Sequence, residues 1–361
     1  MKNRLTIVCV LMALVLVLSS CAPVGEEPAM EEAPVKEEVS VTEEGPYLVA
    51  YMAPNTAEGQ IMFMDSFVRY SEEAGMEVMT VNADSDVTMQ DTQCSDLIAQ
   101  GVNAIVMVPV DSQAIAACVD RATEAGIPVF GIDRQPFSAD TIMTVMSNNY
   151  MAGEQGAQCV VDRLIEKYGE AKGKVIEVTG DLGTNVAQLR GNGFNDMMKE
   201  YSNIEVTTLP TDWMPETGAN VVQDAFAADP TIDAIYWHSD FTGAGIIPAL
   251  GEIGFLKKVG EEGHVILCGI DGDPNSLLNM SEGWQDATVN QPMLDFGVLA
   301  NFVKMYLDGE TLETGVYEEE GMNWSPANIE DTEYGLTMSL ATWLITADDV
   351  DDPTLWGNYG K

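Results

Sequence analysis

The amino-acid sequence predicts an α/β protein of two lobes, each built on a parallel sheet. Apolar segments of strand length recur along the chain, and amphipathic segments of helical length separate them. Continuous apolar strands that alternate with helices indicate parallel sheets covered on both faces. The chain of 361 residues carries more such strands than one mononucleotide-type sheet needs, and it is long enough for two cores.

The expected elements follow one another in a regular order from Tyr47 onward. The strands of the first lobe are Tyr47–Met52, Val78–Val81, Ala104–Val108, Val129–Ile132 and Thr144–Met146. Those of the second lobe are Val175–Val178, Val206–Leu209, Ala234–Trp237, Val265–Gly269 and Ala287–Val289. Helices are expected between them, for example over Gln113–Ala125, Val186–Glu200 and Leu294–Leu307.

The N-terminus has the features of a secretory signal. Lys2 and Arg4 precede the apolar segment Leu5–Leu18, which is too short for a comfortable membrane span. The sequence Leu18-Ser19-Ser20-Cys21 resembles a bacterial lipobox, whose cysteine is lipidated and becomes the mature N-terminus. We therefore expect a signal peptide over residues 1–20 and an exported protein anchored through Cys21 to the periplasmic or extracellular face of the membrane. An ordinary signal peptide that happens to contain a cysteine is the alternative.

The segment after the lipobox differs sharply in composition from the rest of the chain. Residues 21–46 contain paired glutamates and several prolines, with no aromatic residue. Such a segment cannot bury enough apolar surface to offset the entropy of ordering its backbone. We expect a disordered acidic tether between the lipid and the folded part.

The charge of the chain excludes some classes of function. The formal net charge is −42, with 58 acidic and 16 basic residues. Nucleic-acid binding needs a basic face, so it is not expected here. Docking on anionic headgroups is not expected either, which leaves the lipid anchor as the contact with the membrane.

The cysteines give limited information. Cys94, Cys118, Cys159 and Cys268 remain once the signal and the anchor are set aside, and no CxxC or metal-type Cys/His spacing occurs. A Cys94–Cys118 disulfide is conceivable, since both residues lie on successive helices of one lobe, but buried free thiols fit equally well. We expect no metal and no cofactor.

Polar and aromatic residues follow the predicted strands in both lobes. In the first lobe the strands lead into Pro54-Asn55, Pro109-Val110-Asp111-Ser112 and Asp133-Arg134. In the second they lead into Thr211-Asp212-Trp213, Ser239-Asp240 and Asp271-Gly272-Asp273. Ligands of open α/β sheets bind beyond the carboxyl ends of the strands. Helix capping is the commoner role of any single Asp there, and we expect it for Asp111 and Ser112. The same arrangement in both lobes nevertheless favours a shared cleft.

Several segments resemble the ribose-binding-protein group of periplasmic sugar-binding proteins, relatives of the ligand-sensing part of lactose-type repressors. They are DLIAQGVNAIVMVPVDSQAI, AGIPVFGIDRQP, GNGFNDMM, GIDGDPN and ATVNQP. The resemblance covers roughly residues 47–309 and implies a type I periplasmic binding protein: two Rossmann-like lobes joined by three hinge crossovers, which close on a sugar and deliver it to an ABC importer. We expect residues 47–147 and about 292–314 in the first lobe, and 148–291 and about 315–361 in the second.

The resemblance also implies site residues. The ligand contacts it assigns are Asp133, Arg134, Arg190, Trp213, Asp271 and Gln291. A carboxylate accepts from neighbouring hydroxyls, an arginine fork donates to them, and an aromatic face covers the apolar side of a sugar ring. A cleft of this kind binds a small polar ligand through a few placed polar groups.

Departures from the family change the expected specificity. Where the family commonly has Asn-Pro-Phe-Phe, this chain has Ala57-Glu58-Gly59-Gln60, so stacking aromatics are absent there. Ser239 stands in place of a ligand-binding Asn, and Asn55, Glu58 and Gln60 are weaker candidates in the altered loop. The tail after Gly315 is also longer than in short ribose binders. We therefore expect a small polyhydroxy ligand, without naming ribose.

No motif of an enzyme is present: the chain lacks GxSxG, GxxxxGK[ST] and HExxH. The carboxylates of Asp133 and Asp271 could do acid–base work as in glycosidases. Adjacent arginine or backbone donors should favour their ionised forms, which suits binding better than catalysis. His238 is expected to be structural. We expect a monomeric binding protein that serves an ABC permease, with a sensory receptor for a sugar-like signal as one alternative and an anchored glycoside hydrolase as another.

Overall fold

The computed structural model describes residues 46–360. The predicted signal peptide, the lipidation site Cys21 and the acidic tether up to residue 45 lie outside the described residues. Within residues 46–360, no helix has the length and apolar character that a membrane span requires.

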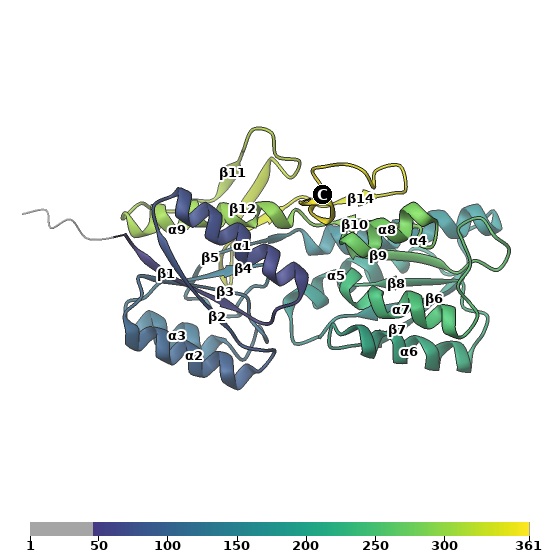
Figure 1. Cartoon of the computed structure of the whole chain (residues 1–361), viewed down its shortest axis with the longest axis horizontal. Coiled ribbons are helices and arrows are strands. Elements are labelled where there is room, and N and C mark those ends of the chain that lie inside the picture. The colour runs from purple at the N-terminus through teal and green to yellow at the C-terminus, as the bar shows by residue number, and fades with distance from the viewer. Residues whose placement is uncertain (1–45, 361) are drawn as a thin grey trace, which may run out of the picture. The chain divides into compact units, whose positions relative to one another are not determined.

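The first lobe is built on an eight-stranded sheet with the order β11-β12-β13-β5-β4-β3-β1-β2 (Figure 1). Its strands are β1 (Leu48–Ala53), β2 (Glu77–Asn82), β3 (Ala104–Met107), β4 (Val129–Ile132), β5 (Thr141–Ser147), β11 (Gly315–Tyr317), β12 (Ala327–Thr332) and β13 (Gly335–Leu340). Its helices are α1 (Glu58–Glu73), α2 (Val87–Gln100), α3 (Ala116–Glu124), the 3-10 helix η1 (Met293–Val298) and α9 (Leu299–Leu307).

Both faces of this sheet are covered, as the apolar strands require. In β1, Val49 and Tyr51 belong to the core beneath α1, η1 and α9, whereas Ala50 and Met52 belong to the core beneath α2 and α3. Successive strand residues point to opposite faces, so an unbroken apolar strand supplies two cores at once. Figure 1 shows α1 and α9 on one side of the sheet, with α2 and α3 on the other.

The second lobe is built on a six-stranded sheet with the order β14-β10-β9-β8-β6-β7. Its strands are β6 (Gly173–Thr179), β7 (Ile204–Pro210), β8 (Ala234–Trp237), β9 (Ile266–Asp271), β10 (Ala287–Asn290) and the antiparallel β14 (Trp343–Ile345). Its helices are α4 (Asn149–Tyr168), α5 (Asn185–Met198), α6 (Pro215–Ala228), α7 (Asp240–Glu252), α8 (Pro274–Glu282) and the short η2 (Trp356–Asn358). The same two-faced packing recurs, with Tyr236 and Trp237 of β8 in different cores.

The predicted strands from Tyr47 to Val289 are all present, with bounds shifted by no more than a few residues. The helix expected over Leu294–Leu307 is divided into η1 and α9, and the one expected from Gln113 begins at Ala116. The two α/β lobes with mostly parallel sheets confirm the predicted fold class.

The C-terminal boundary predicted for the lobes is wrong. Strands β11, β12 and β13 belong to the first sheet, where β13 pairs with β5 in parallel. The chain returns to the second lobe only after Leu340, so residues 315–340 belong to the first lobe and not, as predicted, to the second. The three crossovers therefore follow β5, β10 and β13. Strands β11 to β13 carry many polar residues and pair with a distant edge, which local sequence does not reveal.

All four remaining cysteines form disulfides. Cys94 on α2 is bonded to Cys118 on α3 with an S–S distance of 2.08 Å, and Cys159 on α4 is bonded to Cys268 on β9 at 2.02 Å. The first pairing confirms one of the two alternatives, and the reading as free thiols is wrong. Two bonded pairs agree with the oxidising compartments in which disulfides persist.

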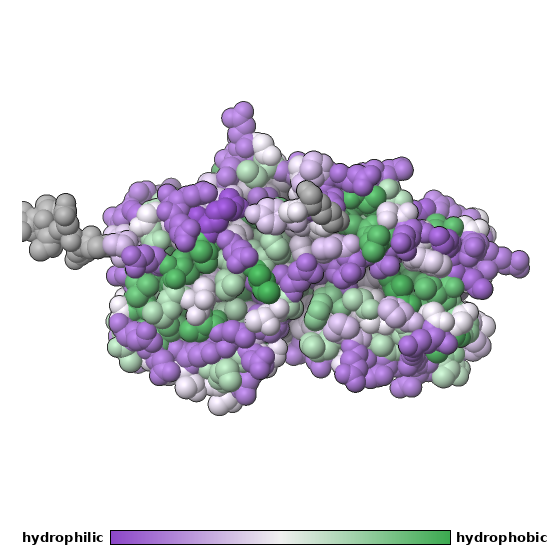
Figure 2. Space-filling model, in the orientation of Figure 1, coloured by the Kyte–Doolittle hydropathy of each residue, from purple (hydrophilic) through white to green (hydrophobic). Residues whose placement is uncertain are grey.

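The surface reflects the acidic composition. Figure 2 shows hydrophilic residues over much of one face, with hydrophobic residues in separate groups over both lobes. A net charge of −42 disfavours self-association because like-charged surfaces repel.

Candidate ligand-binding cleft

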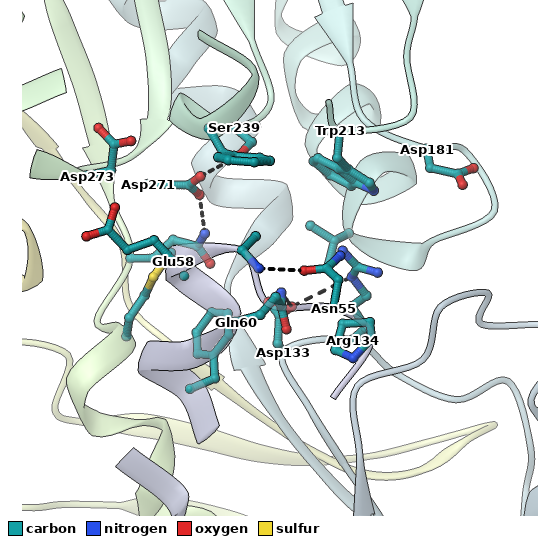
Figure 3. A pocket seen from close by; sticks show the side chains of 18 of the residues that line it. Asn55, Glu58, Gln60, Asp133, Arg134, Asp181, Trp213, Ser239, Asp271 and Asp273 are labelled. Atoms are coloured by element: carbon teal, nitrogen blue, oxygen red, sulfur yellow. Dashed lines mark hydrogen bonds and ion pairs between the residues drawn. The ribbon is translucent and has the colours of Figure 1, made fainter. Parts of the chain in front are cut away.

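A cavity of about 400 Å³ opens where the carboxyl ends of the two sheets face each other (Figure 3). All eight residues predicted as ligand contacts line it: Asn55, Asp133, Arg134, Arg190, Trp213, Ser239, Asp271 and Gln291. Their contact with a ligand stays a prediction. Further polar and aromatic lining residues are Glu58, Gln60, Phe63, Ser85, Asp181, Asp212, Phe241, Asp273, Asn275 and Trp356.

The first lobe contributes a hydrogen-bonded group at the end of β4. Gln60 Nε2 donates to Asp133 Oδ2 at 3.1 Å, and Arg134 Nε lies 3.7 Å from the same oxygen. Arg134 Nη1 donates to the carbonyl of Pro109 at 3.0 Å, which fixes the guanidinium. Within the described residues, Arg134 Nε and Gln60 Oε1 are buried without a hydrogen-bond partner. A donor and an acceptor are therefore free to meet a polyhydroxy ligand.

Asp271 organises the second lobe's side of the cavity. Its Oδ2 accepts from Ser239 Oγ at 2.6 Å and from the backbone N–H of Asp240 at 3.2 Å. Its Oδ1 accepts from Gln291 Nε2, and Arg190 Nη1 lies 3.4 Å away. The carboxylate thus holds three of the other predicted contacts in place, so it orients these side chains as much as it offers an acceptor itself.

The position of Arg190 follows from close helix packing. A Cβ on Gly153 of α4 would lie 2.1 Å from the carbonyl oxygen of Arg190, and one on Gly193 of α5 would lie 2.0 Å from that of Tyr150. Only glycine permits this approach. It lets Arg190 Nε donate to Asn149 Oδ1 at 2.9 Å, while Nη1 donates to the carbonyl of His238.

Trp213 covers one wall of the cavity. A Cβ on Gly180 would lie 2.2 Å from the indole, so the ring rests directly on this glycine. The guanidinium carbon of Arg134 lies 5.5 Å from the ring centroid, which is cation–π distance across the cleft. In Figure 3 the two side chains face each other from opposite lobes. The indole Nε1 is buried and has no hydrogen-bond partner among residues 46–360.

Two weaker candidates near the start of α1, Asn55 and Glu58, line the cavity. Asn55 Oδ1 accepts from the N–H of Ala57 at 3.0 Å, and its Nδ2 donates to Ser85 Oγ at 3.2 Å. Asn55 therefore lines the cavity while its amide shapes the loop. Glu58, the first residue of α1, lies on the same side of the cavity as Asp273 (Figure 3).

Sequence reasoning missed Asp273 and Trp356 as lining residues. Asp273 accepts from the N–H of Ser276 at 2.6 Å and caps α8, which is the role normally given to such a residue. Its place in Asp271-Gly272-Asp273 was the signal available. Trp356 comes from the C-terminal tail, and no sequence feature connected it with the cleft.

Burial, not the neighbouring donors, decides the ionisation of these carboxyl groups. Burial raises the pKa of Asp133, and Arg134 offsets this only in part. Burial raises the pKa of Asp271 to about 7 against the opposing effect of Arg190. The adjacent donors do favour the ionised forms of Asp133 and Asp271, as expected, but burial outweighs them and the pKa of each carboxyl is raised.

Four non-glycine residues that line the cleft have positive φ angles. They are Ser85, Asp133, Trp213 and Asp271, with φ of 60°, 63°, 72° and 135°. Non-glycine residues with positive φ cost free energy, about 1–3 kcal/mol each, and cluster at functional sites. Their coincidence around one cavity makes it the candidate functional centre of the described residues.

Neither residue predicted as a helix cap caps α3, which begins at Ala116 and has no side-chain cap at its N-cap Ile115. Asp111 Oδ1 accepts from the N–H groups of Gln113 and Ala114 at 2.9 and 2.7 Å, so it closes the turn that precedes the helix. Ser112 does not cap: its N–H donates to the carbonyl of Gly183 at 3.1 Å, and its Oγ accepts from the N–H of Asn185 at 3.3 Å. Ser112 therefore bridges the lobes, and the prediction that these two residues cap the helix is wrong.

His238 is fully buried and does not line the cavity. Its Nε2 lies 3.0 Å from Glu177 Oε1, and burial lowers its pKa. This agrees with a structural role. Within residues 46–360, no three His, Cys, Asp or Glu side chains are placed to bind a metal ion.

Comparison with known proteins identifies the family. The sequence profile of the periplasmic binding protein domain matches residues 49–311. The chain belongs to this family. Ribose import binding protein RbsB of Bacillus subtilis is 31% identical over 231 residues, which cover 64% of this chain and 71% of that protein. The xylitol-binding protein of Mycolicibacterium smegmatis is 29% identical over 216 residues, covering 59% and 58%.

Solved structures show the same fold for this periplasmic binding protein. An ABC transporter solute binding protein from Mycobacterium smegmatis with bound glycerol has a TM-score of 0.71 at 23% identity, and the match covers 85% of this chain and 96% of that one. One from Bacillus halodurans with bound myo-inositol has a TM-score of 0.71 at 22% identity, covering 87% and 99%. Membership of this family implies an exported protein.

Proposed function

We propose that this periplasmic binding protein captures a monosaccharide or a similar polyol and presents it to an ABC importer. The observation that carries the proposal is the cavity between the lobes, in which arginines, carboxyls and an indole from both lobes converge. Its volume of about 400 Å³ lies at the lower end of the range for small-molecule sites. Relatives named for ribose, xylitol, D-apiose and D-xylose support this ligand class.

The proposed mechanism is closure of the two lobes on the ligand. The lobes contact each other beside the cavity, where the N–H of Gln135 donates to Asn185 Oδ1 at 3.0 Å. A ligand that contacts Asp133 and Arg134 on one side and Arg190 and Trp213 on the other gains its full affinity only in a closed form. Its differential affinity then shifts the population toward that form.

A thermal-shift screen tests the proposal. The panel contains D-ribose, D-xylose, D-arabinose, D-allose, xylitol and myo-inositol, with amino acids and nucleosides as other classes. A sugar at a hundred times its dissociation constant adds about 2.7 kcal/mol to the free energy of unfolding, a rise in Tm of a few degrees. Stabilisation by amino acids or nucleosides alone would contradict a sugar ligand.

Recovery of the bound sugar separates binding from hydrolysis. The buried carboxyls of Asp133 and Asp271 have raised pKa values, as a general acid of a glycoside hydrolase needs, so this alternative function is tested as well. We expect a bound sugar or glycoside to be recovered unchanged after prolonged incubation. Turnover by the wild type that is lost in Asp133→Asn would favour the hydrolase.

We propose further that Cys21 carries the lipid that anchors the mature protein, which we expect to be monomeric. The carrying observation is the lipobox-like sequence around Cys21. Labelling with a radioactive fatty acid should modify the wild type and not Cys21→Ser. Release of both proteins from the membrane to the same extent would contradict the anchor.

Genes for an ATPase and a permease beside this one would favour import over a sensory role.

A further inference from the structure

The C-terminal segment 341–360 returns to the cleft although it lies beyond the residues that match the family profile. Strand β14 joins the second sheet antiparallel to β10, with Trp343 opposite Asn290. The chain then turns back and η2 packs against α8. Figure 1 shows this yellow segment ending close to β14 and β10.

This segment rests directly on the loop that carries Asp271 and Asp273. The indole Nε1 of Trp356 donates to the carbonyl oxygen of Asp271 at 2.6 Å. A Cβ on Gly357 would lie 2.4 Å from the carbonyl oxygen of Gly272, so the two backbones touch. Asp271 has a φ of 135°, a conformation that needs support from its surroundings. The segment supplies that support through a hydrogen bond and close packing.

Trp356 also connects the lobes. It is 5% exposed and belongs to the same buried apolar cluster as Phe63 and Met293, which pack in the first lobe. Its neighbour Leu355 belongs to a separate cluster with Leu277 of the second lobe. Trp356, Phe63 and Met293 line the cavity together. One indole therefore contacts the first lobe's core, the cavity and the main chain of the second lobe's central carboxylate.

We propose that Trp356 is a positioning residue of the binding site and that the C-terminal segment is part of the binding apparatus. The Trp356 N–H fixes the main chain of Asp271, whose carboxylate in turn holds Ser239, Arg190 and Gln291 toward the cavity. A shift of the Asp271 backbone displaces all three donors at once. This inference rests on the proposed capture of a sugar in the same cavity.

Trp356→Phe is the decisive variant because it keeps an apolar ring and removes the N–H. Trp343→Phe is the matched control: the same substitution in the same segment, at a residue that packs against the Leu277 cluster and is not among the described residues lining the cavity. Calorimetry with D-ribose, xylitol and myo-inositol should show a dissociation constant about three- to tenfold higher for Trp356→Phe. For Trp343→Phe we expect a change of less than about twofold.

Hydrogen exchange in the unliganded protein gives a readout that needs no sugar. The peptide spanning residues 266–275 should exchange faster in Trp356→Phe than in the wild type, and at the wild-type rate in Trp343→Phe. Gly357→Ala, which forces the segment away from Gly272 while keeping the indole, should change the exchange in the same direction. This variant decides the question if Trp356→Phe does not fold.

The outcomes separate this inference from the proposed function. Wild-type affinity and wild-type exchange in both Trp356→Phe and Gly357→Ala would overturn the positioning role. A wild type that binds none of the three sugars would count against the proposed function, while the exchange comparison would still decide whether Trp356 supports Asp271.

Discussion

Asp271 and Asp273 stand two residues apart at the end of β9 and are only 6% and 5% exposed. Burial is the main cause that raises the pKa of Asp271 to about 7 and that of Asp273 to about 8, and the nearby carboxyl of Asp240 adds to both shifts. Each group therefore retains a proton where a free aspartate is ionised. A protonated carboxyl donates as well as accepts, which suits the hydroxyl groups of a sugar.

The two raised pKa values predict how stability depends on pH. The folded state binds more protons than the unfolded chain between about pH 4 and pH 8, so this contribution is present at low pH and is lost as the pH rises. We expect the Tm of the unliganded protein to fall across this window. The fall should be smaller in Asp273→Asn, whose amide still caps α8.

Asp96→Asn is the control for this comparison, since it removes one acidic side chain from the exposed surface of α2. It makes the same Asp-to-Asn change at a surface position and should leave the pH dependence of Tm close to that of the wild type. Identical pH profiles for Asp273→Asn and the wild type would contradict the assignment of Asp273.

A substitution at Gly180 tests the position of the Trp213 ring. An alanine Cβ there would lie 2.2 Å from the Trp213 indole, so Gly180→Ala must displace the ring that faces Arg134. We expect sugar affinity to fall about tenfold or more, measured by calorimetry. Gly251→Ala in α7, where the nearest side-chain atom is 3.7 Å away, should leave affinity unchanged. Equal affinities in the two variants would rule out Trp213 as a wall of the site.

Much of the cleft could be predicted residue by residue. Asp133 follows β4, Asp271 ends β9 and Trp213 lies in the loop after β7, so all three stand at the carboxyl ends of strands. The resemblance to sugar-binding proteins supplied Arg190, within α5, and Gln291, after β10. The ionisation of the carboxyls could not be predicted, because the cost of burying a charge depends on packing that only the folded chain shows.

At the scale of elements, local sequence decides most of the fold. Most of the strands from β1 to β10 are short apolar segments that alternate with helices, and this pattern locates them in the sequence. Strands β11 to β13 pair with one another in antiparallel order, and the pairing of β13 with β5 places all three in the first lobe. Their sequence is compatible with either lobe. The sequence therefore could not show which sheet these strands pair with.

The disulfides lead to a prediction about stability. Cys94–Cys118 closes a loop with a sequence separation of 24, and Cys159–Cys268 one with a separation of 109. Chain entropy then gives about 3 kcal/mol of stabilisation for the first bond and about 5 kcal/mol for the second. Urea unfolding should show a greater loss in the free energy of unfolding for the Cys159→Ser/Cys268→Ser double variant than for Cys94→Ser/Cys118→Ser. The reverse order would contradict the entropic account for this chain.

At the scale of the whole described chain, two sheets offer their carboxyl ends to one cavity, and three crossovers join the lobes that carry them. The arrangement explains why the site draws Asp133 and Arg134 from one lobe, and Arg190 and Asp271 from the other. Neither lobe holds a complete set of donors and acceptors. A ligand enclosed by both must therefore stabilise their contact.

A calorimetric titration tests this central claim most directly. Wild type, Asp133→Ala from the first lobe, Asp271→Ala from the second and the surface control Asp96→Ala are titrated with the sugar that raises Tm most. We predict one site per chain in the wild type and in Asp96→Ala. Each cleft variant should lose about 2–3 kcal/mol of binding free energy, since partners in the cavity are left unpaired. Wild-type affinity in either cleft variant would contradict capture between the lobes.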